Sequence, residues 1–155
     1  MRFTDSESMR EKILYQAEAS EAAAVAELAA QMWAHPTFEL AQGFMEIINS
    51  DDGVIYAAAE EGNIIGFAQC RLRHDYVEGA HSSPVGYLEG IFVSKEYRRR
   101  GYAKALMSQC EQWAKEKGCV EFASDCELTN GESLRFHLKL GFEEVNRIIC
   151  FQKEI

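Results

Sequence analysis

The sequence has no apolar stretch approaching the roughly 20 residues that a membrane-spanning helix needs. Its N-terminal residues, MRFTDSES, lack the apolar core of a secretory signal peptide. The five cysteines are scattered, odd in number and include no Cys-x-x-Cys pair, which argues against a disulfide scaffold or a zinc site. We therefore expect one cytoplasmic domain spanning residues 1–155, with no metal ion and no membrane partner.

Positive charge is also scarce. The 155 residues include 16 Lys and Arg against 25 Asp and Glu, which gives a formal net charge of −9. This balance argues against nucleic acid as a partner and is compatible with a cationic small molecule. The one dense basic cluster consists of Arg98, Arg99, Arg100 and Lys104. We expect an anionic cofactor at this cluster and a cationic substrate elsewhere.

Residues 87–104, YLEGIFVSKEYRRRGYAK, carry the basic cluster between a predicted strand and a predicted helix. Leu88 and Val93 belong to a buried strand pattern, and from residue 103 apolar residues recur at helical spacing. Gly101 has no Cβ, and the helix after it points unpaired N–H groups and its positive dipole end at the turn. A phosphate or pyrophosphate fits this turn, although Gly-x-Gly-x-x-Gly and Gly-Lys-Ser/Thr loops are absent. The alternative is an ordinary basic helix start.

The other elements predict a single mixed α/β sheet. Helices are expected at about 20–33, with Ser20 as N-cap, and at 37–49 and 130–139, and strands at 13–18, 54–59, 64–73, 119–125 and 145–152. The order β-α-α-β-β-β-α-β-α-β indicates a mixed central sheet with helices on both faces. Residues 1–11 are polar and expected to be loosely held. Residues 74–84 form a polar loop whose length is more typical of a functional segment.

Two motifs resemble those of the GCN5-related N-acetyltransferases. Arg98-x-x-Gly101-x-Ala103 resembles their acyl-CoA loop, and Asn130, followed by Gly141-Phe142, resembles their second motif. With the order of elements, the resemblance implies their single-domain fold, in which the central strand and its parallel neighbour splay apart around acetyl-CoA. By matching position it places cofactor binding at Ile91, Phe92, Val93, Arg98, Arg99, Arg100, Gly101, Tyr102, Ala103, Lys104 and Asn130.

Glu89 is the best candidate for a catalytic carboxylate. It lies in an otherwise apolar strand, where burial of a carboxylate is costly without a partner or a function. It would bind the substrate's ammonium group and accept, directly or through water, the proton that must leave before attack. The alternative is a carboxylate at a strand edge facing solvent. Because no histidine is tied to a cysteine by pattern, we expect direct transfer in a ternary complex.

A finer resemblance is to bacterial aminoglycoside 6'-N-acetyltransferases, a group within the same family. It rests on RHDYVEG at 73–79, SSP at 82–84, YLEGI at 87–91 and FASD at 122–125. The resemblance implies acetyl-CoA-dependent acetylation of an aminoglycoside 6'-amine by a homodimer. Carboxylates and aromatic faces suit such cations. Matching positions place substrate binding at Trp33, His35, Tyr76, Glu89, Asp125 and Asn146.

These assignments leave alternatives open. Trp33 could belong to the core, His35 could shape a turn, Tyr76 could anchor the loop, and Asp125 could cap a strand end.

Two positions depart from the family pattern. His137 stands where many acetyltransferases have a tyrosine that protonates the leaving thiolate, so His137 is either that acid or a structural residue. Asn146 stands where a related enzyme could use a carboxylate.

Two other functions also stay open. One is acetylation of a polyamine, an amino sugar or a protein N-terminus, and the other is acetyl-CoA binding without catalysis. Glu89 in the strand and the polar loop at 74–84 favour an enzyme over a binding module.

Overall fold

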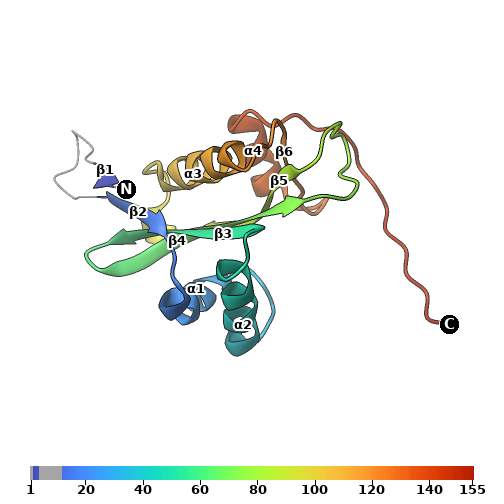
Figure 1. The fold of residues 1–155 in the computed structure, drawn as a ribbon. Coiled ribbons are helices and arrows are strands. Elements are labelled where there is room, and N and C mark those ends of the chain that lie inside the picture. The colour runs from blue at the N-terminus through green and yellow to red at the C-terminus, as the bar shows by residue number, and fades with distance from the viewer. Residues whose placement is uncertain (1, 4–11) are drawn as a thin grey trace.

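The fold is built on one β-sheet, seen nearly edge-on in Figure 1. The computed structural model describes residues 2–3 and 12–155. Six strands follow one another across the sheet in chain order. They are β1 (Arg2–Phe3), β2 (Lys12–Gln16), β3 (Gly53–Glu60), β4 (Asn63–Arg73), β5 (Val85–Val93) and β6 (Phe122–Ser124). Neighbours from β1 to β5 are antiparallel and β6 joins β5 in parallel, which confirms the expected mixed sheet.

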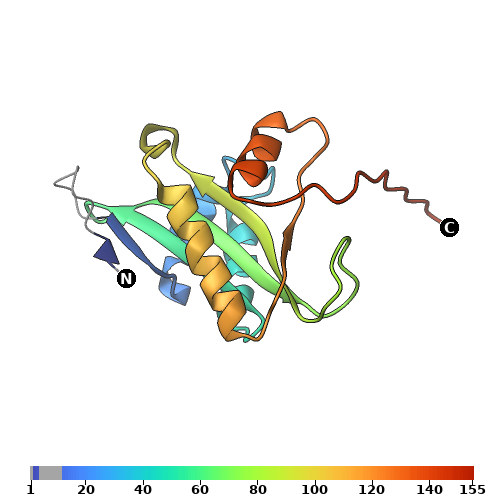
Figure 2. The same ribbon diagram turned by 90° about the horizontal axis from the view of Figure 1, so that it is seen from above.

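Helices cover both faces of the sheet, as expected. The helices α1 (Ala22–Ala29) and α2 (Thr37–Ile48) lie on one face, and α3 (Tyr102–Glu116) lies on the other (Figures 1 and 2). The last helix, α4 (Gly131–Lys139), lies beside β6 on the side of α3. Within residues 2–3 and 12–155, no helix is long and apolar enough to cross a membrane.

The chain enters α1 differently from the prediction, and the expected N-cap at Ser20 is wrong. A 3-10 turn at Ala19–Glu21 precedes the helix. The Glu21 carboxylate accepts a hydrogen bond from the Glu18 N–H at 3.0 Å, and the Glu18 side chain accepts one from the Glu21 N–H. This reciprocal capping satisfies the N–H groups at the helix start, so the Ser20 hydroxyl is not needed there.

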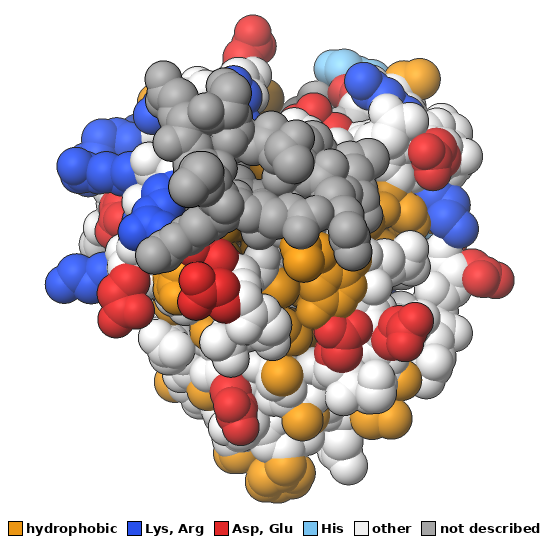
Figure 3. All heavy atoms as spheres, turned by 90° about the vertical axis from the view of Figure 1, so that its left-hand side faces the viewer, with side chains coloured by type: hydrophobic (Ala, Val, Ile, Leu, Met, Phe, Trp, Pro, Cys, Tyr) orange, Lys and Arg blue, Asp and Glu red, His pale blue; other side chains and the backbone are white. Residues whose placement is uncertain are grey.

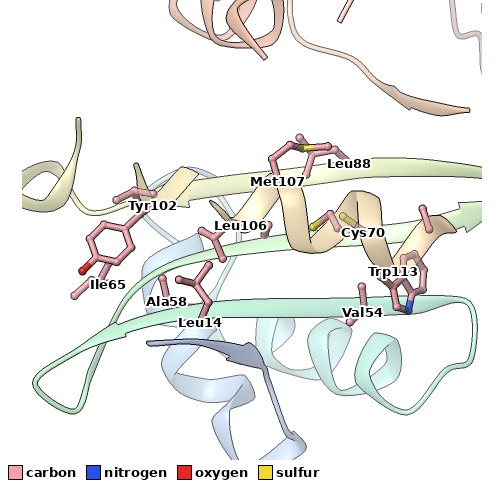
Figure 4. Packing of buried hydrophobic residues seen from close by; sticks show 14 of the residues in the cluster. Leu14, Val54, Ala58, Ile65, Cys70, Leu88, Tyr102, Leu106, Met107 and Trp113 are labelled. Carbon is pink, nitrogen blue, oxygen red and sulfur yellow. The ribbon is translucent and has the colours of Figure 1, made fainter. Parts of the chain in front are cut away.

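Each face of the sheet is buried under its own apolar core. The core under α3 includes Leu14, Val54, Ala58, Ile65, Cys70 and Leu88 from the sheet, and Tyr102, Leu106, Met107, Cys110 and Trp113 from the helix (Figure 4). The core under α1 and α2 includes Val25, Ala26, Ala29 and Phe44 with Ile55, Ala57 and Phe67. Because successive strand residues point to opposite faces, Val54 belongs to the first core and Ile55 to the second.

The strand β5 has two unequal neighbours. On one side it pairs with β4 along nearly its whole length. On the other side, its ladder with β6 has only three pairs, from Gly86 and Phe122 to Leu88 and Ser124. The strand then continues to Val93, and no strand of the described chain pairs with it on that side (Figure 2). β6 ends at Ser124, and the chain beyond it leads away from β5 (Figure 2), which is the splay expected from the family resemblance.

The C-terminal residues form no strand, so the predicted closing strand at 145–152 is wrong. After Gly141, whose φ is 91°, the chain has no regular secondary structure up to Ile155. Figure 1 shows this segment running away from the body of the protein. A strand needs a neighbour for its backbone hydrogen bonds, and no strand of the described chain lies alongside it. The predicted strand at 119–125 is shorter than expected, and the prediction for residues 1–11 lies mostly outside the described residues.

Truncation of Leu106 to alanine should test the core under α3. Leu106 is fully buried in this core, and a buried Leu→Ala change costs about 2–5 kcal/mol of unfolding free energy. Leu128, which is 76% exposed, provides a control whose truncation should cost no more than about 0.5 kcal/mol. Urea unfolding at one protein concentration measures both changes. Equal losses in the two variants would contradict this description of the core.

Candidate functional site

The turn between β5 and α3 has the backbone conformation of an anion-binding loop. Gly101 is the N-cap of α3 and has a left-handed conformation with a φ of 85°. Arg99 is also left-handed, with a φ of 61°, and Arg98 before it is extended. Residues 102–104 form the first turn of α3, so their N–H groups lack intrahelical acceptors. These groups and the positive end of the helix dipole face the turn, which makes it suited to phosphate.

The basic side chains at this turn divide into two kinds. Arg98 donates from Nε to the Val93 carbonyl at 2.8 Å, and Nη1 of Arg100 lies 3.9 Å from the buried Glu60 carboxylate. These contacts bind the two arginine side chains to the rest of the protein and stabilise the loop. Arg99 and Lys104 are exposed and form no ion pair with the part of the chain that the structure describes. They are the cations that remain available to an anion.

The opposite end of the molecule from the C-terminal segment is shown in Figure 3. Hydrophobic and acidic side chains share the described part of this face, and Lys and Arg side chains stand at its margins. The described part of this face is therefore mixed in character.

Glu89 lies in a β-bulge in the middle of β5. Adjacent residues of β4 pair with Leu88 and Gly90, so Glu89 has no partner on β4. A bulge adds a residue to one strand and redirects the side chains near it. Leu88 and Ile91 are separated by two residues, a spacing that would place them on opposite faces of a regular strand. Because of the bulge, both pack toward α3. The bulge stands at the point where β5 and β6 separate.

The Glu89 carboxylate is bound by Arg73, the last residue of β4. Nη2 of Arg73 lies 3.0 and 3.1 Å from the two carboxylate oxygens, and Nε lies 3.3 Å from Oε1. The Arg73 guanidinium carbon also lies 3.4 Å from the centre of the Tyr87 ring, and the Tyr87 hydroxyl donates a hydrogen bond to Asp125. Burial, followed by the bond to Asp125, raises the pKa of Tyr87, which therefore stays protonated. One chain of contacts thus links Glu89 to Asp125.

Trp33 adjoins this group through Gly90. A Cβ atom at Gly90 would overlap the six-membered ring of Trp33, so the contact requires glycine. Trp33 also packs against Phe44 and Phe67, with ring centroids 6.2 and 6.1 Å apart. Trp33 therefore belongs to the core under α1 and α2 and also borders the residue next to Glu89, while its role in substrate binding stays a prediction.

A second cluster lies on the loop at 74–84. The Tyr76 hydroxyl donates to Glu78 at 2.7 Å, and Nδ2 of Asn146 donates to the same carboxylate at 2.9 Å. The bond from Asn146, followed by that from Tyr76, lowers the pKa of Glu78. His35 is exposed, and its backbone N–H donates to the Trp33 carbonyl at 2.9 Å, as in a turn. No described contact joins the His35 side chain to either cluster.

His137 and Asn130 hold α4 in place. Nδ1 of His137 donates to the Ser133 carbonyl at 2.7 Å, and Nε2 lies 2.8 Å from the Ser124 hydroxyl, which contacts the Leu88 carbonyl at 3.2 Å. Asn130 caps α4 by accepting from the Ser133 N–H at 3.0 Å. Both ring nitrogens of His137 are engaged, which favours the structural alternative. Its role as an acid stays a prediction.

Sequence reasoning missed Arg73, Tyr87 and Glu78 as members of these clusters. Tyr87 precedes Glu89 by two residues on the same strand, and that spacing is a usable signal. Arg73 meets Glu89 only through the register of β4 against β5, which the sequence does not specify. Among the described residues, no group of three His, Cys, Asp or Glu side chains is placed to hold a metal ion.

The arrangement places a cation-binding end and an anion-binding end on the same strand. Carboxylates and aromatic rings surround the bulge of β5, and free N–H groups and cations lie at the turn after its last residue. Between them, residues 89–93 have no strand partner on the β6 side within the described part of the chain. An anionic donor and a cationic acceptor could therefore meet along β5.

Comparison with known proteins agrees with this geometry. Residues 15–142 match the acetyltransferase (GNAT) family model. An aminoglycoside N(6')-acetyltransferase type 1 of Salmonella typhimurium is 46% identical over 125 residues, which cover 79% of this chain and 86% of the relative. The corresponding protein of Stenotrophomonas maltophilia is 36% identical over 137 residues, or 88% of this chain and 90% of the relative.

Solved structures give the same result. The aminoglycoside N-acetyltransferase AAC(6')-Iy in complex with CoA has a TM-score of 0.91 and 38% identity, covering 96% of this chain and 98% of that one. The same enzyme with the bisubstrate analogue CoA-S-monomethyl-acetylneamine has a TM-score of 0.88 and 39% identity, covering 93% and 99%. The loop motif, the splayed strands and these likenesses together show that the chain belongs to the acetyltransferase (GNAT) family.

Proposed function

We propose that this protein transfers the acetyl group of acetyl-CoA to the 6'-amine of aminoglycosides. The observation that carries the proposal is the acidic and aromatic cluster at the bulge of β5, on the same strand that leads into an anion-binding turn. The relatives named for this activity support it, as does the structure bound to an analogue that joins CoA to an acetylated aminoglycoside. Acetylation would turn an ammonium group into a neutral amide and thereby confer resistance.

The residues of the turn fit the phosphate groups of acetyl-CoA. Amides of residues 99–104 would receive the pyrophosphate, with Arg99 and Lys104 as counter-charges, because these cations form no ion pair within the described chain. The backbone of Ile91, Phe92 and Val93 would bind the pantetheine arm and the thioester carbonyl. Donors fixed in place before reaction typically lower a barrier by a few kcal/mol. Asn130 would act through α4, which it caps.

The amine half of the reaction falls to the residues around the bulge. Glu89 would bind the 6'-ammonium and take its proton, directly or through water, so that the free amine attacks the acetyl carbon. The carbon–sulfur bond then breaks, and CoA leaves as a thiolate that takes up the second proton released from the new amide nitrogen. Asp125 and the Trp33 and Tyr76 rings would bind the rest of the sugar cation. His35 and Asn146 would complete the pocket, with Asn146 acting on Glu78 as well.

We also propose that the protein is a cytoplasmic homodimer. All five cysteines are free, as expected in a reducing compartment. For the dimer, the support is the C-terminal arm, which we define as residues 147–155. Before the arm, Val145 packs beside Gly79 and Asn146 bonds to Glu78, whereas within it Ile148, Ile149 and Phe151 are 66%, 81% and 91% exposed.

These features favour a second copy of the chain as the partner that the arm binds. The arm leaves the body beside a groove of about 600 Å³ lined by residues of β6, the end of α4 and the loop at 78–80. β6 is an edge strand, and an unpaired edge accepts an added strand. Two copies related by a two-fold axis could exchange arms and bury their apolar residues reciprocally.

An amine panel tests the proposed reaction. Purified protein with acetyl-CoA should release thiol with kanamycin- or tobramycin-like compounds bearing a 6'-amine. The same scaffolds with a 6'-hydroxyl should react at least about a hundredfold more slowly, because no ammonium meets Glu89. Thiol release with spermidine or a peptide N-terminus, and with none of the 6'-amino compounds, would replace the aminoglycoside proposal with that of another amine acetyltransferase.

Exchange of Gly101 for valine should test the cofactor loop. Valine is disfavoured at a positive φ, and its side chain would stand in a turn that must admit phosphate. Acetyl-CoA affinity should fall at least about tenfold, or about 1.4 kcal/mol, by calorimetric titration. Gly118→Val is a matched control, since Gly118 has a φ of 91° and open space around it but follows the other end of α3. Equal affinities in the two folded variants would rule out this placement.

Deletion of the arm should make the protein monomeric. Sedimentation velocity at micromolar concentration should give a dimer for the full chain and a monomer for the chain ending at Asn146. Ile149→Asp should weaken the dimer, whereas Gln152→Asp adds the same charge to a polar arm position and should leave it intact. A monomeric full chain, or a truncated chain that stays dimeric, would refute the arm-mediated dimer.

A further inference from the structure

The ion pair between Arg73 and Glu89 places a cation of the protein on the carboxylate that the proposed function assigns to the substrate. The two Glu89 oxygens lie 3.0 and 3.1 Å from Nη2 of Arg73. The side chains are 41% and 24% exposed, so the pair stands at the solvent boundary. Another cation can reach this carboxylate without opening either core.

Arg73 has a second contact that does not depend on Glu89. Its guanidinium carbon lies 3.4 Å from the centre of the Tyr87 ring, and Tyr87 is only 6% exposed. The hydrogen bond from the Tyr87 hydroxyl to Asp125 fixes this ring further. Because a guanidinium stacks well on an aromatic face, Arg73 can release the carboxylate and stay stacked on the ring.

Charge balance makes the release necessary when an amine binds. An ammonium group placed against Glu89 with Arg73 still bound would put two cations on one carboxylate, and they would repel each other. A single ammonium replaces a planar, two-point guanidinium contact poorly. A polycation offsets this loss, because its other ammonium groups can meet Asp125, which lies at the far end of the same chain of contacts.

We propose that Arg73 is a positioning residue that holds Glu89 in the free enzyme and gives up the carboxylate to the substrate's ammonium. The amine-competent state is then a minor state of the free protein, which weakens the apparent binding of any amine that depends on Glu89 alone. A polycation also binds through its other ammonium groups at Asp125, so its apparent affinity depends less on the release of Glu89. Arg73 therefore sets a preference for multiply charged amines, and this inference rests on the proposed function of Glu89.

Kinetics of two variants test the exchange. Arg73→Met should lower KM about tenfold for 6-amino-6-deoxyglucose, a sugar with one amine, and less than about threefold for kanamycin, because the competing cation is gone. Arg73→Lys keeps the competitor and should preserve the preference for kanamycin. Arg71→Met removes the same charge two residues earlier on the strand, where no described carboxylate pairs with it, and should leave both KM values near those of the wild type. Equal effects of Arg73→Met and Arg71→Met would overturn the proposal.

A binding measurement separates this proposal from the proposed function. Kanamycin is titrated into nitrogen-15-labelled wild-type protein without acetyl-CoA, so that no reaction occurs. The Arg73 Nε–H resonance should shift and exchange faster with water as its bond to Glu89 is lost, while acetyl-CoA alone should leave it unchanged. An unchanged resonance at saturating kanamycin, in protein that acetylates kanamycin, would refute the exchange. If the wild type acetylates no aminoglycoside, the proposed function fails, and titration with the amine that it does accept decides the exchange.

Discussion

The separation of β5 from β6 is the constraint on which the rest of the site depends. The ladder between them stops after three pairs, and the bulge at Glu89 lies where it stops. A fully paired β5 would have both edges hydrogen-bonded and no room for a thioester arm beside it. The contact of His137 with Ser124, and of Ser124 with the Leu88 carbonyl, holds α4 across the last pair. The helix after β6 therefore helps to keep the two strands in this diverging arrangement.

The same bulge explains how a carboxylate is tolerated in an apolar strand. Glu89 meets a guanidinium with both oxygens, and this partner is itself stacked on a buried tyrosine. A carboxylate with such a partner avoids the cost of an unpaired buried charge. Neither alternative drawn from the sequence, a free catalytic base or an edge carboxylate in solvent, included this partner.

Local sequence pattern was sufficient to predict most of the helices and strands. The helix at 37–49, the hairpin around residues 61–62 and the helix from residue 103 were predicted to within about two residues, because periodicity and turn residues are local properties. The closing strand failed because a strand depends on a neighbour, and sequence pattern does not say which chain supplies it. The pairing of Arg73 with Glu89 was missed because it depends on register and on a bulge. The loop motif was informative because its backbone geometry, with Gly101 left-handed at the helix start, is encoded within a few residues.

The two cores serve different ends of the site. Tyr102, on the helix turn that follows Gly101, is buried in the core under α3, whereas Trp33, which borders Gly90, packs on Phe44 and Phe67 in the core under α1 and α2. The sheet thus lies between the core that supports the turn at Gly101 and the core that supports the indole ring beside Gly90. Phe44 of α2 packs on the indole ring of Trp33, so a substitution at Phe44 can affect the surroundings of Gly90 without involving α3. Under the proposed function, substrate preference can therefore diverge through the layer of α1 and α2 while the layer of α3, which carries the proposed cofactor turn, stays unchanged.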